Sequence, residues 1–358
     1  MHRKATIRLL RHEDLRNLQR GSGGEGRKKF SLNARNWLGR LWHRMERMNS
    51  LKMREALPLW LSHVSVDEIP GDVQLELLNM SARTIERYLA EEKRHWRRRA
   101  NSGTRASKHV TSVPLRGLDV QPEGPGHIEI DSVAHCGGSL TGVHVWTVTA
   151  TDMATGWTVT RAISGKEAVT VRRALEAIEH AFPFSWKAIY FDNGTEFLND
   201  EVVRRFARRG DSQGEIQVFR GRPYRKNDQA HVEQKNWTHV RRLWGYSRFS
   251  GEFMASRMNA ATHRFWHDLQ NFFIPQQKVI LNERHGSRRV RKLDRPKTPF
   301  ERLLCYPNEL VPLSVKARLT SEYRTLNPFT LRLKLIRAVR DVFAYVGKEK
   351  ENPRRHVS

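Results

Sequence analysis

Three acidic residues stand where their carboxylates could share metal ions. Asp131 ends the predicted strand HIEID, Asp192 ends the predicted strand AIYFD, and Glu233 lies in the predicted helix NDQAHVEQKNW. Carboxylate oxygens are the ligands that Mg²⁺ and Mn²⁺ prefer. Two such ions about 4 Å apart can activate an attacking oxygen and stabilise a leaving one in phosphoryl transfer. The spacing alone also allows a plainer interpretation, in which acids at strand ends cap loops or face water.

The elements around these acids alternate between strand and helix. In HIEID, Ile128 and Ile130 face the core while the residues between them face the other way. Downstream patterns predict the order β-β-β-α-β-α-β-α, a mixed α/β layer. Groups at the carboxyl ends of strands gather at one edge of an open sheet. Glu233 would share a helix face with Trp237, whose packing on the sheet would bring the carboxylate to the same edge.

The composition predicts a polyanionic partner. The formal net charge is +26, from 64 Lys and Arg against 38 Asp and Glu, and nucleic acid is the favoured partner of such a chain. A membrane partner is disfavoured, because we find no apolar run of transmembrane length and no signal peptide. With 2 cysteines in 358 residues, we expect a reducing compartment and no disulfide framework.

A helical pair near 71–94 is a candidate DNA reader. DVQLELLN and MSARTIERYLAEEKR predict a helix, a tight turn and a second helix, with Ser81 as N-cap and Ile85 and Leu89 buried. A recognition helix presents exposed side chains near its N-terminus to DNA. The DNA-contacting candidates are therefore Arg83, Thr84 and Arg87. The alternative is an ordinary helical hairpin with a solvated charged face.

Composition shifts divide the chain into four regions. RRRANSGTRASKHVTS is polar and basic, which is typical of a linker. Residues 278–302 hold nine Lys or Arg against three acids, and 328–350 have a helical pattern. We expect a helical DNA-binding region at 1–96, a basic linker at 97–119, a catalytic core at 120–250 and a basic C-terminal region at 251–358.

Three stretches around the acids, IEIDSVAHCGG, YFDNGTEF and RPYRKNDQAHVEQKNW, resemble the three blocks of the DDE transposase and retroviral-integrase superfamily. The catalytic core of that superfamily has a ribonuclease H-like fold. Matched residue by residue, Asp131 corresponds to its first acid, Asp192 to its second, and Glu233 to its third. Asn236 completes the E-x-x-N context of the third block. Val240 stands where the family has a basic residue two turns after the glutamate.

The resemblance implies an activity and its cofactor. KLDRPKTPFERLL and LNPFTLR resemble the tails of bacterial insertion-sequence transposases, and MHRKATIRLL resembles the end of a first helix-turn-helix, which implies a missing upstream segment. A transposase cleaves DNA at element ends and joins the freed 3′-hydroxyl to target DNA. The three acids would hold two Mg²⁺ or Mn²⁺ ions, and Asn193 would support them. DNA contacts are assigned to Arg222, Lys226, Lys235, Asn236 and Arg241.

The expected partner is double-stranded DNA, bound by a homo-oligomer in the cytoplasm at the bacterial nucleoid. Two alternatives stay open. One is a metal-dependent nuclease that cuts without strand transfer, and the other is an inactive DNA-binding remnant. Metal-dependent cleavage separates the remnant from the other two, and joined products separate the transposase from the nuclease. Salt-sensitive DNA binding is common to all three.

Overall fold

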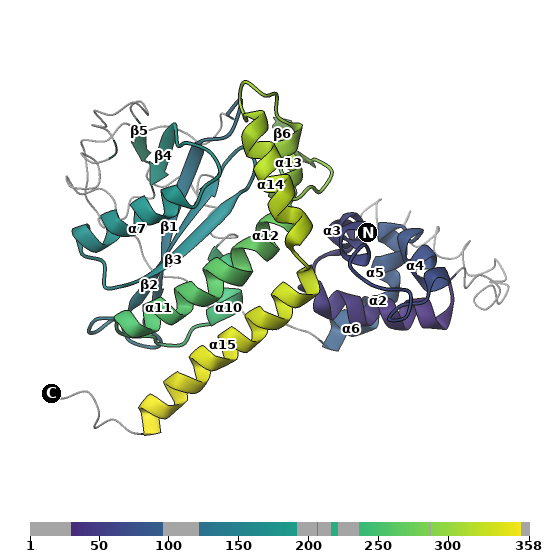
Figure 1. The fold of residues 1–358 in the computed structure, drawn as a ribbon, viewed down its shortest axis with the longest axis horizontal. Helices are drawn as coiled ribbons and strands as arrows, with labels where there is room; N and C mark the ends of the chain where they lie inside the picture. Colours follow the sequence, from purple (N-terminus) through teal and green to yellow (C-terminus); the bar gives the residue numbers. More distant parts are fainter. Residues whose placement is uncertain are drawn as a thin grey trace, which may run out of the picture.

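The computed structural model describes residues 30–95, 122–191, 206, 216–220, 236–285 and 288–351 (Figure 1). A group of N-terminal helices lies beside a sheet that is flanked by further helices, and the long helix α15 runs along the sheet-covering helices (Figure 1). Among these residues, no helix is both long and apolar enough to cross a membrane. The predicted linker at 97–119 lies outside the described residues.

The central sheet has five strands in the order β3-β2-β1-β4-β5. Strand β2 pairs antiparallel with both β1 and β3, and β4 and β5 continue the sheet parallel to β1. Their bounds are His127–His135, Val145–Asp152, Thr158–Ser164, Ala188–Phe191 and Gln217–Arg220. This mixed sheet confirms the predicted mixed α/β layer.

Helix α7 (Ala168–His180) connects β3 to β4 and packs against β3 and β2. Its buried residues recur at helical spacing and form one face: Val171, Ala174, Leu175 and Ile178. A crossover helix of this kind is what allows β4 to join the sheet parallel to β1.

Helices α11 (Glu252–Ala261) and α12 (His267–Phe273), joined by the π-helical turn η2 (Thr262–Trp266), lie against edge strand β3. Three polar side chains bond to alternate residues of its backbone: Asn259 to Ala162, His267 to Thr160, and Asn271 to Thr158. An edge strand has unpaired N–H and C=O groups, and these side chains occupy them. The sheet therefore packs with helices beyond the boundary that we expected at 250.

The N-terminal helices form a compact group with the bounds Leu32–Arg44 (α2), Ser50–Leu61 (α3), Gly71–Leu78 (α4), Ala82–Tyr88 (α5) and Ala90–His95 (α6). The predicted helical pair is α4 and α5, both of which pack on α3. Ser81 Oγ accepts the Thr84 N–H at 3.2 Å, which confirms the predicted cap. Ile85 and Leu89 are buried, as predicted.

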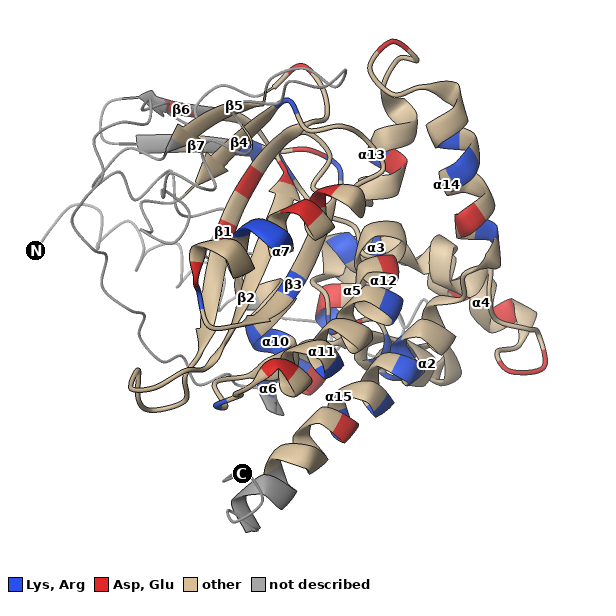
Figure 2. Ribbon diagram, turned by 60° about the vertical axis from the view of Figure 1, so that its left-hand side comes forward, with Lys and Arg blue, Asp and Glu red and all other residues tan. Residues whose placement is uncertain are grey.

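The C-terminal region holds an antiparallel hairpin that the sequence analysis missed, and then three helices. The elements are β6 (Val279–His285), β7 (Arg288–Leu293), α13 (Pro299–Cys305), α14 (Leu313–Thr325) and α15 (Pro328–Glu351). Helix α15 confirms the predicted helix at 328–350. Basic residues are spread along α14 and α15 (Figure 2), and the exposed ones on α15 include Lys334, Arg337 and Arg340.

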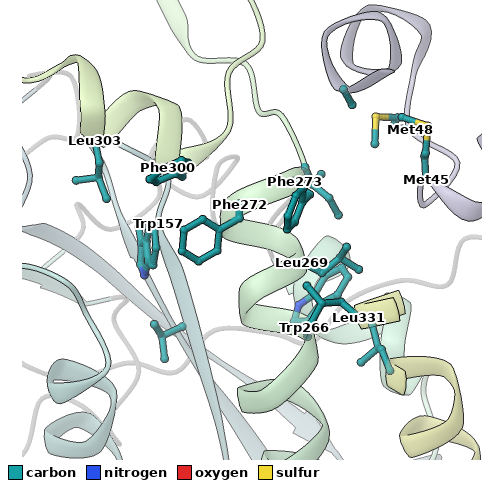
Figure 3. Close-up of a cluster of buried hydrophobic side chains, with 14 of the residues drawn as sticks. Met45, Met48, Trp157, Trp266, Leu269, Phe272, Phe273, Phe300, Leu303 and Leu331 are labelled. Carbon is teal, nitrogen blue, oxygen red and sulfur yellow. The ribbon is translucent and has the colours of Figure 1, made fainter. Parts of the chain in front are cut away.

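One hydrophobic core connects the N-terminal helices to the sheet. Met45 and Met48, which follow α2, belong to the same buried cluster as Trp157 beside the sheet. Between them lie aromatic residues of the helices that follow the sheet (Figure 3): Trp266, Phe272, Phe273 and Phe300. The N-terminal helices are therefore packed on the rest of the molecule and are not held by a linker alone.

Candidate functional site

Asp131 lies in the middle of β1, half-buried and paired in register with Thr149 of β2. The prediction that this strand ends at Asp131 is wrong, because pairing with β2 continues to His135. The parallel pairing with β4 is described only as far as Ile130 and Phe191. Asp131 therefore stands one residue past the last described pair with β4.

The alternation within β1 orients this carboxylate. Ile128 and Ile130 are fully buried on the core side, as predicted. Asp131 Oδ1 accepts the N–H of Ser132 at 2.7 Å. The side chain is therefore held close to its own backbone, and its second oxygen is left for other partners.

Asn236 supplies such a partner from a distant part of the chain. Its side-chain amide donates to Asp131 Oδ2 across 105 positions of sequence. The Asn236 Oδ1 atom is buried and has no hydrogen-bond partner among the described residues. The first and third sequence blocks are thus brought together.

The helical segment after Asn236 is anchored on the sheet. It begins with the π-helical turn η1 (Trp237–Arg241) and continues as α10 (Arg242–Trp244). Val240 and Trp244 are buried in a second core cluster together with Val133 of β1. A π turn widens the backbone locally and often occurs at functional sites. This anchoring fixes the position from which Asn236 reaches Asp131.

Arg241 strengthens the anchor. Its two Nη atoms donate to the carbonyl oxygens of Ala134 at 3.0 Å and Gly245 at 3.2 Å, and its guanidinium lies 4.8 Å from the Tyr246 ring centroid. Burial lowers the pKa of Arg241. Sequence reasoning assigned Arg241 to DNA and missed this scaffold role. Its DNA contact stays a prediction.

Several predicted site residues lie outside the described residues, and their predicted roles stay untested. They are Asp192, Asn193, Arg222, Lys226, Glu233 and Lys235. Phe191, the last described residue of β4, is buried and directly precedes Asp192 in the chain. Among the described residues, no three His, Cys, Asp or Glu side chains gather as a metal site. Two of the three predicted ligands, Asp192 and Glu233, lie outside the described residues.

The candidate DNA contacts on α5 have different surroundings. Arg83 and Arg87 are exposed, and the Arg87 guanidinium lies 5.0 Å from the Tyr88 ring centroid. Thr84 is half-buried, and its hydroxyl lies 3.0 Å from Ser81 Oγ. The two arginines are therefore available to a ligand, whereas Thr84 is already part of the helix cap.

His135, at the end of β1, belongs to the scaffold beneath the site. It is fully buried, and its Nε2 lies 2.8 Å from Thr147 Oγ1. Burial, with smaller contributions from Arg241 and His144, lowers the pKa of His135 to about 3. It is therefore neutral at pH 7 and has no direct access to a substrate.

Two comparisons with known proteins gave little. No family model matches the chain. A search of solved structures found the catalytic core domain of BIV integrase, which is 17% identical and covers 34% of this chain and 72% of that chain. The TM-score is 0.26, too low to support an argument about structure or function.

A curated relative is much closer in sequence. The uncharacterized protein y4rM of Sinorhizobium fredii (strain NBRC 101917 / NGR234) is 34% identical over 317 residues, which cover 85% of this chain and 86% of the relative. The match covers most of the length of both proteins. The chain therefore belongs to the same protein family as y4rM.

Proposed function

We propose that this protein is a DDE-type DNA transposase, which cleaves DNA at element ends and transfers the freed 3′-hydroxyl to target DNA. The observation that carries the proposal is the hydrogen bond from Asn236 to Asp131. It joins two of the three sequence blocks that resemble the superfamily, although 105 positions separate them. The five-stranded mixed sheet supports the ribonuclease H-like core that the resemblance implies.

The described oxygens fit a hard divalent cation. An ionised carboxylate is a hard oxygen ligand, and the Asp131 carboxylate accepts from the Ser132 N–H and from the Asn236 amide. Asn236 Oδ1 adds a buried oxygen that has no hydrogen-bond partner among the described residues. Asp192 and Glu233 would complete the ligands of two Mg²⁺ or Mn²⁺ ions. When bound, these ions would supply activation of the attacking oxygen and stabilisation of the leaving one.

The chain's own side chains would orient the acidic residues and bind DNA phosphates. Asn236 would hold the Asp131 carboxylate in one orientation, and Arg241 would keep the helix that carries Asn236 against β1. Asn193 would support the second acid. DNA phosphates would be bound by basic residues: Arg222, Lys226 and Lys235. The net charge of +26 supports double-stranded DNA as the partner. The protein would act as a homo-oligomer in the cytoplasm.

The test uses purified protein and a labelled duplex that carries the DNA flanking its gene, with Mg²⁺ or Mn²⁺ and with EDTA. Wild type is compared with Asp131→Asn and Asp192→Asn. Asp67→Asn, in an exposed loop, is the matched control. We expect nicked and joined products from wild type and the control, and none from the two site variants or with EDTA.

Other outcomes would favour one of the two alternative functions or contradict the site. Metal-dependent nicks without joined products favour a nuclease. Tight binding with no product, on flanks shown to contain both element ends, leaves a DNA-binding remnant. Products that survive Asp131→Asn contradict the assignment of this site.

A further inference from the structure

The contact between the N-terminal helices and the rest of the molecule is centred on Trp60 of α3. Trp60 is fully buried, and its indole N–H donates to the carbonyl oxygen of Phe273, the last residue of α12, at 3.1 Å. Its ring meets Phe329 of α15 edge to face, with centroids 4.9 Å apart. A directional bond inside an apolar contact fixes the orientation of α3 as well as its proximity.

Glu46, just after α2, makes the second part of this contact. Its Oε2 lies 2.9 Å from Arg242 Nη2 in α10, and its Oε1 lies 2.8 Å from Arg332 Nε in α15. Arg242 also donates to the Glu46 carbonyl oxygen. The side chains are 11% and 19% exposed, so the ion pairs are only weakly screened by solvent. One carboxylate thus ties together three segments that are far apart in sequence.

The backbone at this point is strained. Glu46 and Arg47 have φ angles of 57° and 48°, in the left-handed region that non-glycine residues rarely occupy. Such conformations persist where surrounding contacts over-determine them, and they cluster at functional sites. Here the contacts are the bonds from Arg242 to both the carboxylate and the carbonyl group of Glu46.

The charges around Glu46 are unbalanced. Lys52 is half-exposed, and burial, with a smaller contribution from the charge of Arg242, lowers the pKa of Lys52. Lys52 adds positive charge near Arg242, and Arg242 and Arg332 share the Glu46 carboxylate. Removing its charge would leave mutually repelling cations where the two parts of the molecule meet.

We propose that these contacts, which we call the Glu46 junction (Glu46, Trp60, Arg242, Phe273 and Arg332), act as a ruler. They hold α5 at a fixed position relative to Asp131, so that DNA is cut at a fixed number of base pairs from the duplex bound by α5. This inference rests on the proposed function and on the predicted DNA contacts of Arg83 and Arg87 on α5. Arg242 directly follows η1, the segment whose preceding residue, Asn236, contacts Asp131. The junction therefore joins the N-terminal helices to the same segment that builds the site (Figure 1).

The first experiment tests the junction without DNA. A specific protease site is placed between Ser107 and Lys108 of the full chain, and the cut protein is passed over a sizing column. We expect the two wild-type pieces to elute together, and the pieces of Glu46→Gln to separate. Trp60→Phe, which keeps the ring but removes the N–H donor, is a second, milder variant. The matched control is Glu68→Gln, whose exposed pair with Arg44, at 2.8 Å, lies within the N-terminal helices.

The second experiment maps cut positions on the element-end duplex at single-nucleotide resolution. Wild type and Glu68→Gln should cut at one position. Glu46→Gln and Trp60→Phe should spread the cuts over several nucleotides while far-UV circular dichroism stays unchanged. Separation of the wild-type pieces after cutting would overturn the ruler, and so would a single cut position in variants whose pieces separate. A wild type that cuts nowhere would instead refute the proposed function, and the ruler would fall with it.

Discussion

At the β3 edge of the sheet, polar side chains of the covering helices complete the hydrogen bonding of the backbone. Asn259 and Asn271 each donate to the carbonyl and accept from the N–H of one β3 residue, at 2.7 to 3.0 Å. His267 Nε2 accepts the Thr160 N–H at 2.9 Å. Around β1, in contrast, Asn236 uses its N–H on Asp131 and keeps a buried oxygen without a partner among the described residues.

The difference separates two uses of a buried polar residue. A buried polar group that is left unpaired costs about 1–3 kcal/mol, so pairs are normally completed where only stability matters. The β3 edge follows that rule. Asn259 and Asn271 bond the backbone N–H and C=O groups that a neighbouring strand would otherwise bond. The site around Asp131 departs from it, and an incompletely satisfied oxygen beside a carboxylate is what a cation or substrate site requires. Mutations on the two sides should therefore affect different measurements.

Asp131→Asn should have the largest effect, and only on activity. The amide keeps one acceptor but loses the charge needed to hold a divalent cation, so cleavage should fall by more than the about 10- to 100-fold that outer-shell changes cause. The free energy of unfolding should change by less than about 1 kcal/mol, because the side chain is half-buried and asparagine keeps a carbonyl oxygen as an acceptor. Gel assays of cleavage and urea denaturation measure the two quantities. Wild-type rates in Asp131→Asn would contradict the comparison.

Asn271→Ala should show the opposite pattern. It removes the side chain that bonds both the N–H and the C=O of Thr158, a buried residue. Two such groups predict a loss of about 2–6 kcal/mol in the free energy of unfolding. Urea denaturation measures it. Asn308→Ala, at an exposed position, is the control and should stay within about 0.5 kcal/mol of wild type. Equal midpoints for Asn271→Ala and the control would show that the edge bonds contribute nothing.

Asn236→Ala lies between these cases. It removes a partner that orients Asp131 but leaves the carboxylate in place, so cleavage should fall by about 10- to 100-fold. Raising the Mg²⁺ concentration should restore part of the activity, because the lost orientation weakens metal binding. A titration of rate against Mg²⁺ measures this. A fall in rate that no Mg²⁺ concentration changes would mean that Asn236 acts on DNA and not through Asp131.

Sequence patterns predicted much of this fold because the signals are local. The alternation in HIEID oriented β1 correctly, and Ser81 was correctly placed as a helix cap. The stretches IEIDSVAHCGG and EQKNW resemble two blocks of the DDE superfamily. That resemblance singled out Asp131 and Asn236, which are in contact in the structure. The extension of β1 to His135 was missed because it depends on pairing with β2.

The β3 edge was missed for a different reason. Polar residues recur at four-residue intervals in the helical stretch that contains Asn259, His267 and Asn271. Such spacing marks one helix face, but a polar face normally indicates contact with water. Only the tertiary structure shows that this face meets unpaired backbone groups. The Glu46 junction was missed likewise, since residues separated by 196 positions form it.

The smallest effect concerns two buried histidines, His267 at the β3 edge and His135 below the site. Burial, with a smaller contribution from His263, lowers the pKa of His267 to about 3, close to that of His135. Between about pH 3 and 6.5 the unfolded chain binds protons that the folded chain does not, so stability is lost as pH falls below about 6.5. Each histidine should contribute about 1.4 kcal/mol per pH unit in this range.

His267→Gln and His135→Gln should each remove one of these contributions, which urea midpoints at pH 7.5, 6.0 and 5.0 would measure. The two variants also sharpen the comparison between the two sides. Because His267 must be neutral to accept the Thr160 N–H, His267→Gln should flatten the pH dependence while keeping an acceptor for that group. Because burial lowers both pKa values to about 3, each variant should lose the same slope, about 1.4 kcal/mol per pH unit, below about pH 6.5. A variant that keeps the wild-type slope would show that its histidine does not contribute to the response to pH.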